Sequence, residues 1–329
     1  MKMKASAITA AALLALAAGG YAAQNSSAVG YTTVTVPANS DAVVSVPFSN
    51  EMEFEATVNS INGSEVGVDA VLTGGAYAGG GYYLRITSGA AEGMWSTISA
   101  NGSAGVQVSN SNILADLQVG DSVAVFAHHT LGSVFAPELK DVTFKSTTQI
   151  LIPNSAATGI NKSAVVYAYY ASGRPPSFTP GWYQGSTLSN NKVLEPETFV
   201  LVRNSGNAAA LTVAVSGLVP ATDVNKAIAA SASANDLYLS GLPTDMMLGE
   251  LNVSGLGQLL VVNNNAAGIN KSPIVYTYYV GGRPPSFQPG WYQGSTYANT
   301  NVLSAGTGFI LRRSAGAPAS TWAVNNPIN

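Results

Sequence analysis

The feature that most constrains the fold is a long internal repeat in the second half of the chain. Residues 157–187 (ATGINKSAVVYAYYASGRPPSFTPGWYQGST) match residues 266–296 (AAGINKSPIVYTYYVGGRPPSFQPGWYQGST) at 24 of 31 positions, with a constant offset of 109. Strands at 199–203 and 309–313 follow, the second displaced by one residue. A solenoid needs at least about three repeats. The repeat therefore predicts two similar β units, packed in one sandwich or as tandem modules.

The first half of the chain shows the period-two alternation of half-buried antiparallel strands. Asn62-Gly63 and Asn101-Gly102 each lie between two such runs and predict hairpins, since type I′ turns need φ > 0. Strand spacing of this kind is typical of a small barrel or sandwich. The predicted strands are Thr32–Val36, Ala42–Pro47, Glu53–Ile61, Glu65–Val71, Tyr82–Ile86, Trp95–Ser99, Gly105–Val108 and Ser122–Ala127.

We therefore predict an all-β protein with an N-terminal β domain over 24–145 and a duplicated β-sandwich region over 146–329. The repeat copies would cover about 146–220 and 255–329. The linker 221–254 would contain a short helix from Val224 to about Ala234, capped by Asp223 or Thr222. Whether 146–329 forms one domain or two is left open.

The N-terminal residues predict export. Lys2 and Lys4 precede an apolar run of 14 residues, and small residues follow at 19–23. This pattern is typical of a signal peptide spanning residues 1–23, and the run is shorter than the ~20 residues of a membrane span. We expect no transmembrane segment and an extracellular, cell-surface or periplasmic location.

Composition narrows the function classes. The chain has no cysteine, so packing and sheet pairing must stabilise it without disulfides. Removing residues 1–23 leaves 12 basic and 17 acidic residues, a poor balance for binding nucleic acid. The charges are uneven: residues 24–145 are acidic and residues 146–329 are basic overall, which favours docking of the two parts or self-association.

Several segments carry a family resemblance: Val29–Asp41 (VGYTTVTVPANSD), Tyr82–Met94 (YYLRITSGAAEGM), Gly120-Asp121 and the two AxGINKS segments. With these, the chain resembles an uncharacterised paralogous family of exported β-rich proteins from Verrucomicrobia-type bacteria. The resemblance implies a secreted product and assigns no catalytic residue. The RPPSFTPGW loop departs from the family pattern.

The duplicated loop is the main candidate site. Its two prolines favour an extended, stiff path that lowers the entropy lost on binding. Aromatic rings beside amides suit a sugar or protein ligand, whereas packing over a sheet end is the competing interpretation. The candidate ligand-binding residues are Arg174, Phe178, Trp182, Tyr183 and Gln184, with Arg283, Phe287, Trp291, Tyr292 and Gln293 in the second copy.

Other chemistry is poorly supported by the sequence. His128 and His129 are neighbours that would face opposite sides of a strand, so they predict no metal site. Glu195 and Glu197 suggest solvated edge charge that discourages aggregation. We therefore expect no cofactor and no enzymatic activity. The first hypothesis is a secreted or cell-surface structural protein that self-associates; the alternative is a module that binds polysaccharide or protein through the duplicated loops.

Overall fold

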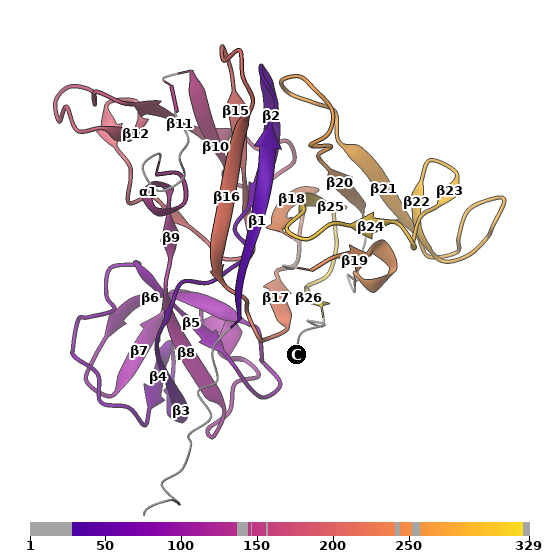
Figure 1. Ribbon diagram of the computed structural model, residues 1–329. Helices are drawn as coiled ribbons and strands as arrows, with labels where there is room; N and C mark the ends of the chain where they lie inside the picture. Colours follow the sequence, from indigo (N-terminus) through magenta and orange to yellow (C-terminus); the bar gives the residue numbers. More distant parts are fainter. Residues whose placement is uncertain are drawn as a thin grey trace, which may run out of the picture.

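The structure is a computed structural model that describes residues 28–136, 144–145, 147–155, 157–240, 244–251 and 257–324. It confirms the all-β prediction: six strands close into a barrel, and two six-stranded sheets with short accessory ribbons make up the rest of the described chain (Figure 1). The predicted signal peptide, residues 1–23, lies outside the described residues.

The barrel is built from six of the eight strands predicted in the first half of the chain. Its strands close in the order β3-β4-β7-β6-β5-β8, and a 3₁₀ turn (η1, Ser111–Leu114) follows β7. Alternate side chains such as Val58, Val66, Leu84, Ile98 and Val125 point inward and form a separate core. The bounds are β3 Met52–Asn62, β4 Glu65–Val68, β5 Tyr82–Ile86, β6 Trp95–Asn101, β7 Gly105–Val108 and β8 Ser122–Ala127.

The first two strands do not join the barrel. β1 (Val29–Val36) pairs with β16 (Leu211–Leu218), and β2 (Ser40–Ser45) pairs with β15 (Phe199–Asn204). The strands expected to form one unit over 24–145 are thus divided between the barrel and the first sheet. β2 is almost fully buried and pairs with β15, whose residues lie about 160 positions further along the chain.

The first six-stranded sheet has the order β13-β12-β11-β10-β15-β2. The ribbon β1-β16 and a small segment formed by β9, the one-turn helix α1 and β14 complete this unit around one core. Its remaining elements are β9 His129–Thr130, α1 Leu131–Val134, β10 Thr148–Pro153, β11 Ala164–Tyr170, β12 Gly181–Gln184, β13 Thr187–Leu188 and β14 Val193–Leu194.

The second unit repeats the first, element by element. Its sheet runs β18-β25-β20-β21-β22-β23, with the ribbon β17-β26 in place of β1-β16 and β19-β24 in place of β9-β14. The barrel is therefore an insertion between β2 and β9 of the first unit. The bounds are β17 Val224–Ile228, β18 Asn235–Ser240, β19 Met246–Met247, η2 Leu248–Glu250, β20 Gln258–Val261, β21 Ile274–Tyr279, β22 Gly290–Gln293, β23 Thr296–Tyr297, β24 Val302–Leu303, β25 Gly308–Arg313 and β26 Ser320–Val324.

The predicted linker helix from Val224 to Ala234 is wrong. Residues 224–228 form β17, which pairs antiparallel with β26 and buries Val224 and Ile228 in the second core. Residues four apart lie on one face of a helix and also on one face of a strand, so the Val224/Ile228 spacing does not separate the two structures.

The register of the repeat also differs from the sequence alignment. Arg203 in β15 lies opposite Asp41, and Arg312 in β25 lies opposite Asp236. The offset thus stays at 109 through this strand, and Arg312 is the equivalent of Arg203. The extra residue expected before the second strand does not exist, because Phe199 corresponds to Gly308.

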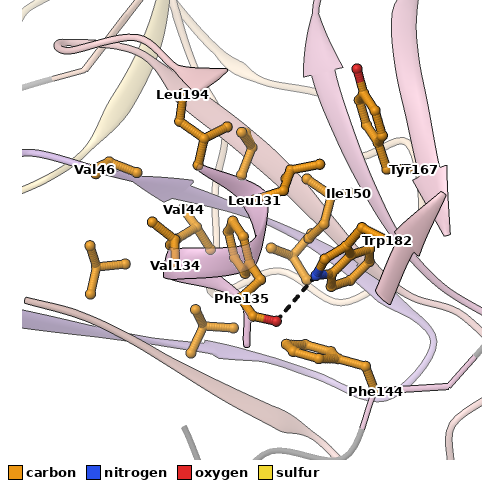
Figure 2. Packing of buried hydrophobic residues seen from close by; sticks show 14 of the residues in the cluster. Val44, Val46, Leu131, Val134, Phe135, Phe144, Ile150, Tyr167, Trp182 and Leu194 are labelled. Atoms are coloured by element: carbon orange, nitrogen blue, oxygen red, sulfur yellow. Dashed lines mark hydrogen bonds between the residues drawn. The ribbon is translucent and has the colours of Figure 1, made fainter. Parts of the chain in front are cut away.

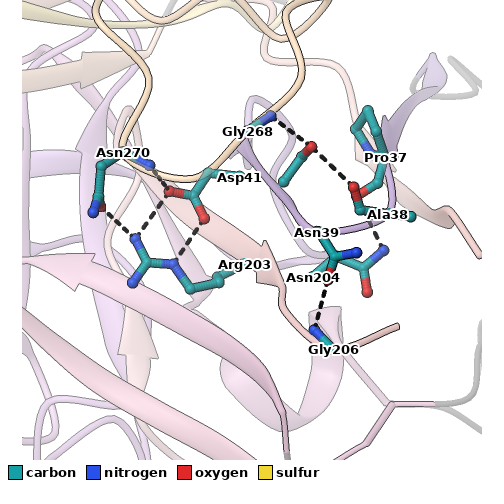
Figure 3. A network of polar contacts seen from close by, with 10 residues as sticks. Pro37, Ala38, Asn39, Asp41, Arg203, Asn204, Gly206, Gly268 and Asn270 are labelled. Atoms are coloured by element: carbon teal, nitrogen blue, oxygen red, sulfur yellow. Dashed lines mark hydrogen bonds and ion pairs between the residues drawn. The ribbon is translucent and has the colours of Figure 1, made fainter. Parts of the chain in front are cut away.

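The two units dock through the repeated Gly-Ile-Asn-Lys-Ser segments, residues 159–163 and 268–272, and Figure 3 shows the contact of the second segment with the first unit. Asp41 receives a bidentate contact from Arg203, with N···O distances of 2.8 and 2.9 Å. The backbone N–H of Asn270, from the second unit, donates to the same carboxylate at 2.8 Å, and the Asn270 side-chain oxygen accepts from Arg203 at 2.6 Å. The backbone of Asn270 is in the left-handed region, with φ 56°.

The same arrangement occurs in reverse. Arg312 binds Asp236 at 2.7 and 3.0 Å, and Asn161 of the first unit bridges this pair. The asparagine of each unit therefore contacts the ion pair of the other unit. This reciprocal contact relates the two units by an approximate twofold axis. Their inner strands meet at the centre of the molecule, and β13 and β23 form the outer edges.

Candidate functional site

The duplicated loop connects β11 to β12 and is a tight, internally bonded turn. Arg174 lies over the Tyr170 ring at 5.2 Å and donates to the Tyr170 hydroxyl and to the Gly185 carbonyl, both at 3.0 Å. The Tyr183 hydroxyl donates to the Thr179 carbonyl at 2.6 Å and contacts the Ser177 hydroxyl at 2.7 Å. The candidate Arg and Tyr side chains therefore hold the loop in shape.

The second copy, between β21 and β22, repeats these contacts. Arg283 lies 5.4 Å from the centre of the Tyr279 ring and donates to the Gly294 carbonyl at 2.9 Å. The Tyr292 hydroxyl donates to the Gln288 carbonyl and contacts Ser286. Thr179 and Gln288 differ between the loops, but only their backbone carbonyls bind the tyrosine, so the turn is preserved.

The two tryptophans of the candidate site lie in the cores. Trp182 and Trp291 are each 1% exposed. Figure 2 shows Trp182 among Phe135, Phe144 and Ile150, and its indole N–H donates to the Phe135 carbonyl at 3.2 Å. Neither indole face is available to a ligand, which supports the packing interpretation for this part of the motif.

Two candidate residues in each loop remain accessible. Phe178 and Phe287 are both 65% exposed, and Gln184 and Gln293 are also exposed. Both phenylalanines adopt a left-handed conformation, with φ 50° and 53°. This conformation is unusual for a bulky residue and is found where the surrounding structure imposes it. Each loop therefore has an exposed aromatic tip, Phe178 in the first and Phe287 in the second.

A close backbone approach fixes each tip. Gly173 has φ 69°, and a Cβ at this position would lie 2.1 Å from the Phe178 carbonyl carbon. Gly282 has the same relation to Phe287, at 2.2 Å. Only glycine fits there, so the turn is specified by sequence in both copies.

The two tips lie far apart. β12 and β22 are each second from the outer edge of their sheets. Figure 1 shows them, with their loops, on opposite sides of the molecule. One ligand of small size cannot contact both.

A second cluster joins the barrel to the first unit, and it corrects the interpretation of Glu197 as solvated edge charge. Glu197 is 8% exposed and accepts from Arg85 Nη2 at 3.2 Å and from the Trp95 indole at 3.1 Å. Its φ is 58°, whereas the equivalent residue in the second unit is Gly306, with φ 68°. The replacement of a left-handed glycine by a glutamate in one copy is the sequence signal that could have identified this contact.

The histidines lie beside this cluster. The His128 ring packs against Tyr83 and Trp95, and its Nε2 contacts the Thr97 hydroxyl at 3.1 Å. Burial, with a smaller contribution from His129, lowers the pKa of His128 from 6.5 to about 4. His129 contacts the Phe48 carbonyl instead. In the described ranges, no group of three or more potential metal ligands comes together.

Comparisons with protein-family models, curated proteins and solved structures found no match. Among the helices of the described segments, none has the length and hydrophobicity required to cross a membrane.

Proposed function

We propose that this protein is an exported structural protein, without catalytic activity, that assembles through its two aromatic tips. The observation that carries the proposal is the presence of the same rigid, exposed phenylalanine at opposite sides of one molecule. Contact between like tips would leave one free tip at each end of a growing assembly. A chain of copies would therefore extend linearly, whereas a single twofold contact would close as a dimer.

A binding module for carbohydrate or protein remains the second candidate, with the same loops as its contact surface. Burial of Trp182 and Trp291 leaves Phe178, Phe287 and two glutamines for such a ligand. An isolated phenylalanine on a fixed turn suits an apolar protein surface better than a sugar ring that also needs several hydrogen bonds. This difference favours a protein partner, and a second copy of this chain satisfies it.

Export is part of the proposal. It is supported by Lys2, Lys4 and the following apolar run, by the absence of cysteine, and by the family resemblance of the Val29–Asp41 segment. A chain with only 9% charged residues also suits a protein that packs against copies of itself.

The test is analytical ultracentrifugation of the chain from residue 24 over a range of concentrations, with negative-stain microscopy. We expect a ladder of species that lengthens with concentration. The Phe178→Ser variant should stop at dimers, because only the Phe287 tip remains, and Phe287→Ser should do the same. The double variant should be a monomer.

The control is Val71→Ser, which removes another exposed apolar side chain, 95% exposed, from the barrel. It should leave the ladder unchanged. A monomeric wild-type chain at all concentrations, or a ladder that persists in the double variant, would refute assembly through the tips. Precipitation of a polysaccharide by the wild-type monomer, lost in the double variant, would favour the second candidate.

A further inference from the structure

A polar pocket lies where the barrel, the first unit and the second unit meet. It is about 300 Å³ in volume. β6 and the segment after β7 contribute Trp95, Ser109 and Asn110, the turn before β15 contributes Glu195, and β17 contributes Asn225 and Lys226. Pockets at the junction of domains are frequent ligand sites, and this volume lies at the low end of the roughly 300–1,000 Å³ seen for small molecules.

Several polar groups of this pocket have no partner within the protein. The Asn225 side-chain oxygen is buried and accepts no hydrogen bond from the described residues. Over the same residues, neither Glu195 nor Lys226 forms an ion pair, although the Lys226 ammonium lies 5.9 Å from the Trp95 ring centre. A buried polar atom without a partner costs free energy, so the Asn225 oxygen calls for a bound molecule or a functional reason.

The duplication shows that these charges are particular to the junction. Glu195 corresponds to Ser304 in the second unit. Strand pairing places Lys226, opposite Trp322, at the position of Val34, opposite Val213. Each unit thus carries one charge at the pocket, a carboxylate in the first and an ammonium in the second, where the other unit has an uncharged residue. Since Glu197 already binds the barrel, docking does not require the other two charges.

The lining defines the chemistry of the ligand. One carboxylate and one ammonium balance in charge, which disfavours a ligand with a net charge. Asn110, Asn225 and Ser109 add amide and hydroxyl groups that both donate and accept hydrogen bonds. The half-buried Trp95 indole adds an apolar aromatic surface beside the Lys226 ammonium, which lies 5.9 Å from its ring centre, and such a surface suits the C–H face of a pyranose ring. We propose that this junction pocket binds one neutral sugar residue, either free or at the end of a glycan.

The test uses Trp95 as its own reporter. The other three tryptophans, Trp182, Trp291 and Trp322, are at most 1% exposed, whereas Trp95 is half-buried and lines the pocket. Quenching by acrylamide therefore reports chiefly on Trp95. We expect at least one of glucose, galactose, mannose and N-acetylglucosamine to protect the full chain from quenching in a saturable manner.

Two variants of similar size to the wild-type residues test whether the charged groups of the pocket bind the sugar. Glu195→Gln and Lys226→Met should each weaken sugar binding by about 10-fold or more, the cost of losing a charge-assisted hydrogen bond. Glu51→Gln, which changes an exposed glutamate of the barrel segment, should bind as the wild type does. Thermal midpoints measured in parallel show whether the variants are folded.

The proposal is overturned if none of the four sugars protects Trp95, or if protection is unchanged in both folded pocket variants. It is also overturned if only zwitterionic or net-charged compounds, such as glycine or inorganic phosphate, give protection. The Phe178→Ser/Phe287→Ser double variant should retain sugar binding, which separates the failure of this site from the failure of assembly through the tips.

Discussion

The stability of the contact between the barrel and the first unit should depend mainly on the ion pair of Arg85 with Glu197, although the backbone of Glu197 is strained. Glu197 adopts φ 58°, a conformation that costs a non-glycine residue about 1 kcal/mol or more. Its carboxylate accepts hydrogen bonds from Arg85 and from the Trp95 indole. Arg85 is 4% exposed; it also donates a long hydrogen bond, 3.4 Å, to the Thr222 hydroxyl, and its guanidinium lies 5.9 Å from the centre of the Tyr83 ring.

We expect Glu197→Gly to destabilise the protein even though it relieves the strain. Removing one partner of a buried ion pair costs roughly 3–5 kcal/mol, because the remaining charge stays buried. Relief of the left-handed conformation returns about 1 kcal/mol, so the net loss should be about 2–4 kcal/mol. Glu197→Ala loses the same carboxylate without the relief, and should be about 1 kcal/mol less stable than Glu197→Gly.

Urea unfolding followed by tryptophan fluorescence measures these differences, and the pair Arg85→Met with Glu197→Gly completes a double-mutant cycle. The double variant should be more stable than the sum of the single losses predicts, since it leaves no unpaired charge. A Glu197→Gly variant more stable than the wild type would show that strain outweighs pairing. Additive single losses would show that the two side chains are not coupled.

Three further predictions follow from burial and close contact. Burial lowers the pKa of His128 to about 4, against 6.5 in the unfolded chain, so the folded state binds fewer protons between these pH values. The contribution of His128 to stability should therefore be constant above pH 6.5 and fall by about 3 kcal/mol as the pH decreases to about 4. Urea midpoints of the His128→Gln variant should lack this fall. Gly93→Ala should cost roughly 3 kcal/mol, because its Cβ would lie 2.1 Å from the Asp223 carbonyl oxygen, whereas Gly63→Ala, also left-handed but in open space, should cost about 1 kcal/mol in the same assay. Trp182→Ala should lose about 3–5 kcal/mol and Phe178→Ala less than about 0.5 kcal/mol, and similar losses for both would contradict the assignment of Trp182 to the core and Phe178 to the surface.

The candidate site was only partly predictable from the sequence. The repeat identified both loops, but the extended path predicted from the two prolines is wrong. Each loop is a tight turn, in which the Phe178 N–H donates to the Arg174 carbonyl and the Phe287 N–H to the Arg283 carbonyl, both at 3.0 Å. The sequence could not distinguish the buried Trp182 from the exposed Phe178, since both are large aromatic residues in one loop. Their exposure depends on Phe135 and Phe144, which lie about 40 residues away in the chain and form the wall against which Trp182 packs.

Local pattern by itself determined the β class, the barrel strands, the hairpin between β3 and β4 and the duplication. The type I′ turn expected at Asn62-Gly63 is wrong, because Asn62 ends β3 and the turn residues are Gly63 and Ser64. Side-chain alternation and turn residues act over a few positions and are readable in one segment. Only the tertiary structure decided that β2 joins β15, that residues 224–228 form a strand, and that Glu197 binds Arg85. Each of these contacts joins residues roughly 100 or more positions apart, and which edges meet is decided by the complementarity of whole surfaces after the chain has collapsed. The sequence of residues 224–228 fits a helix and a strand equally well. The strand forms because β26 provides its hydrogen-bonding partners and the buried Trp322 lies opposite Lys226.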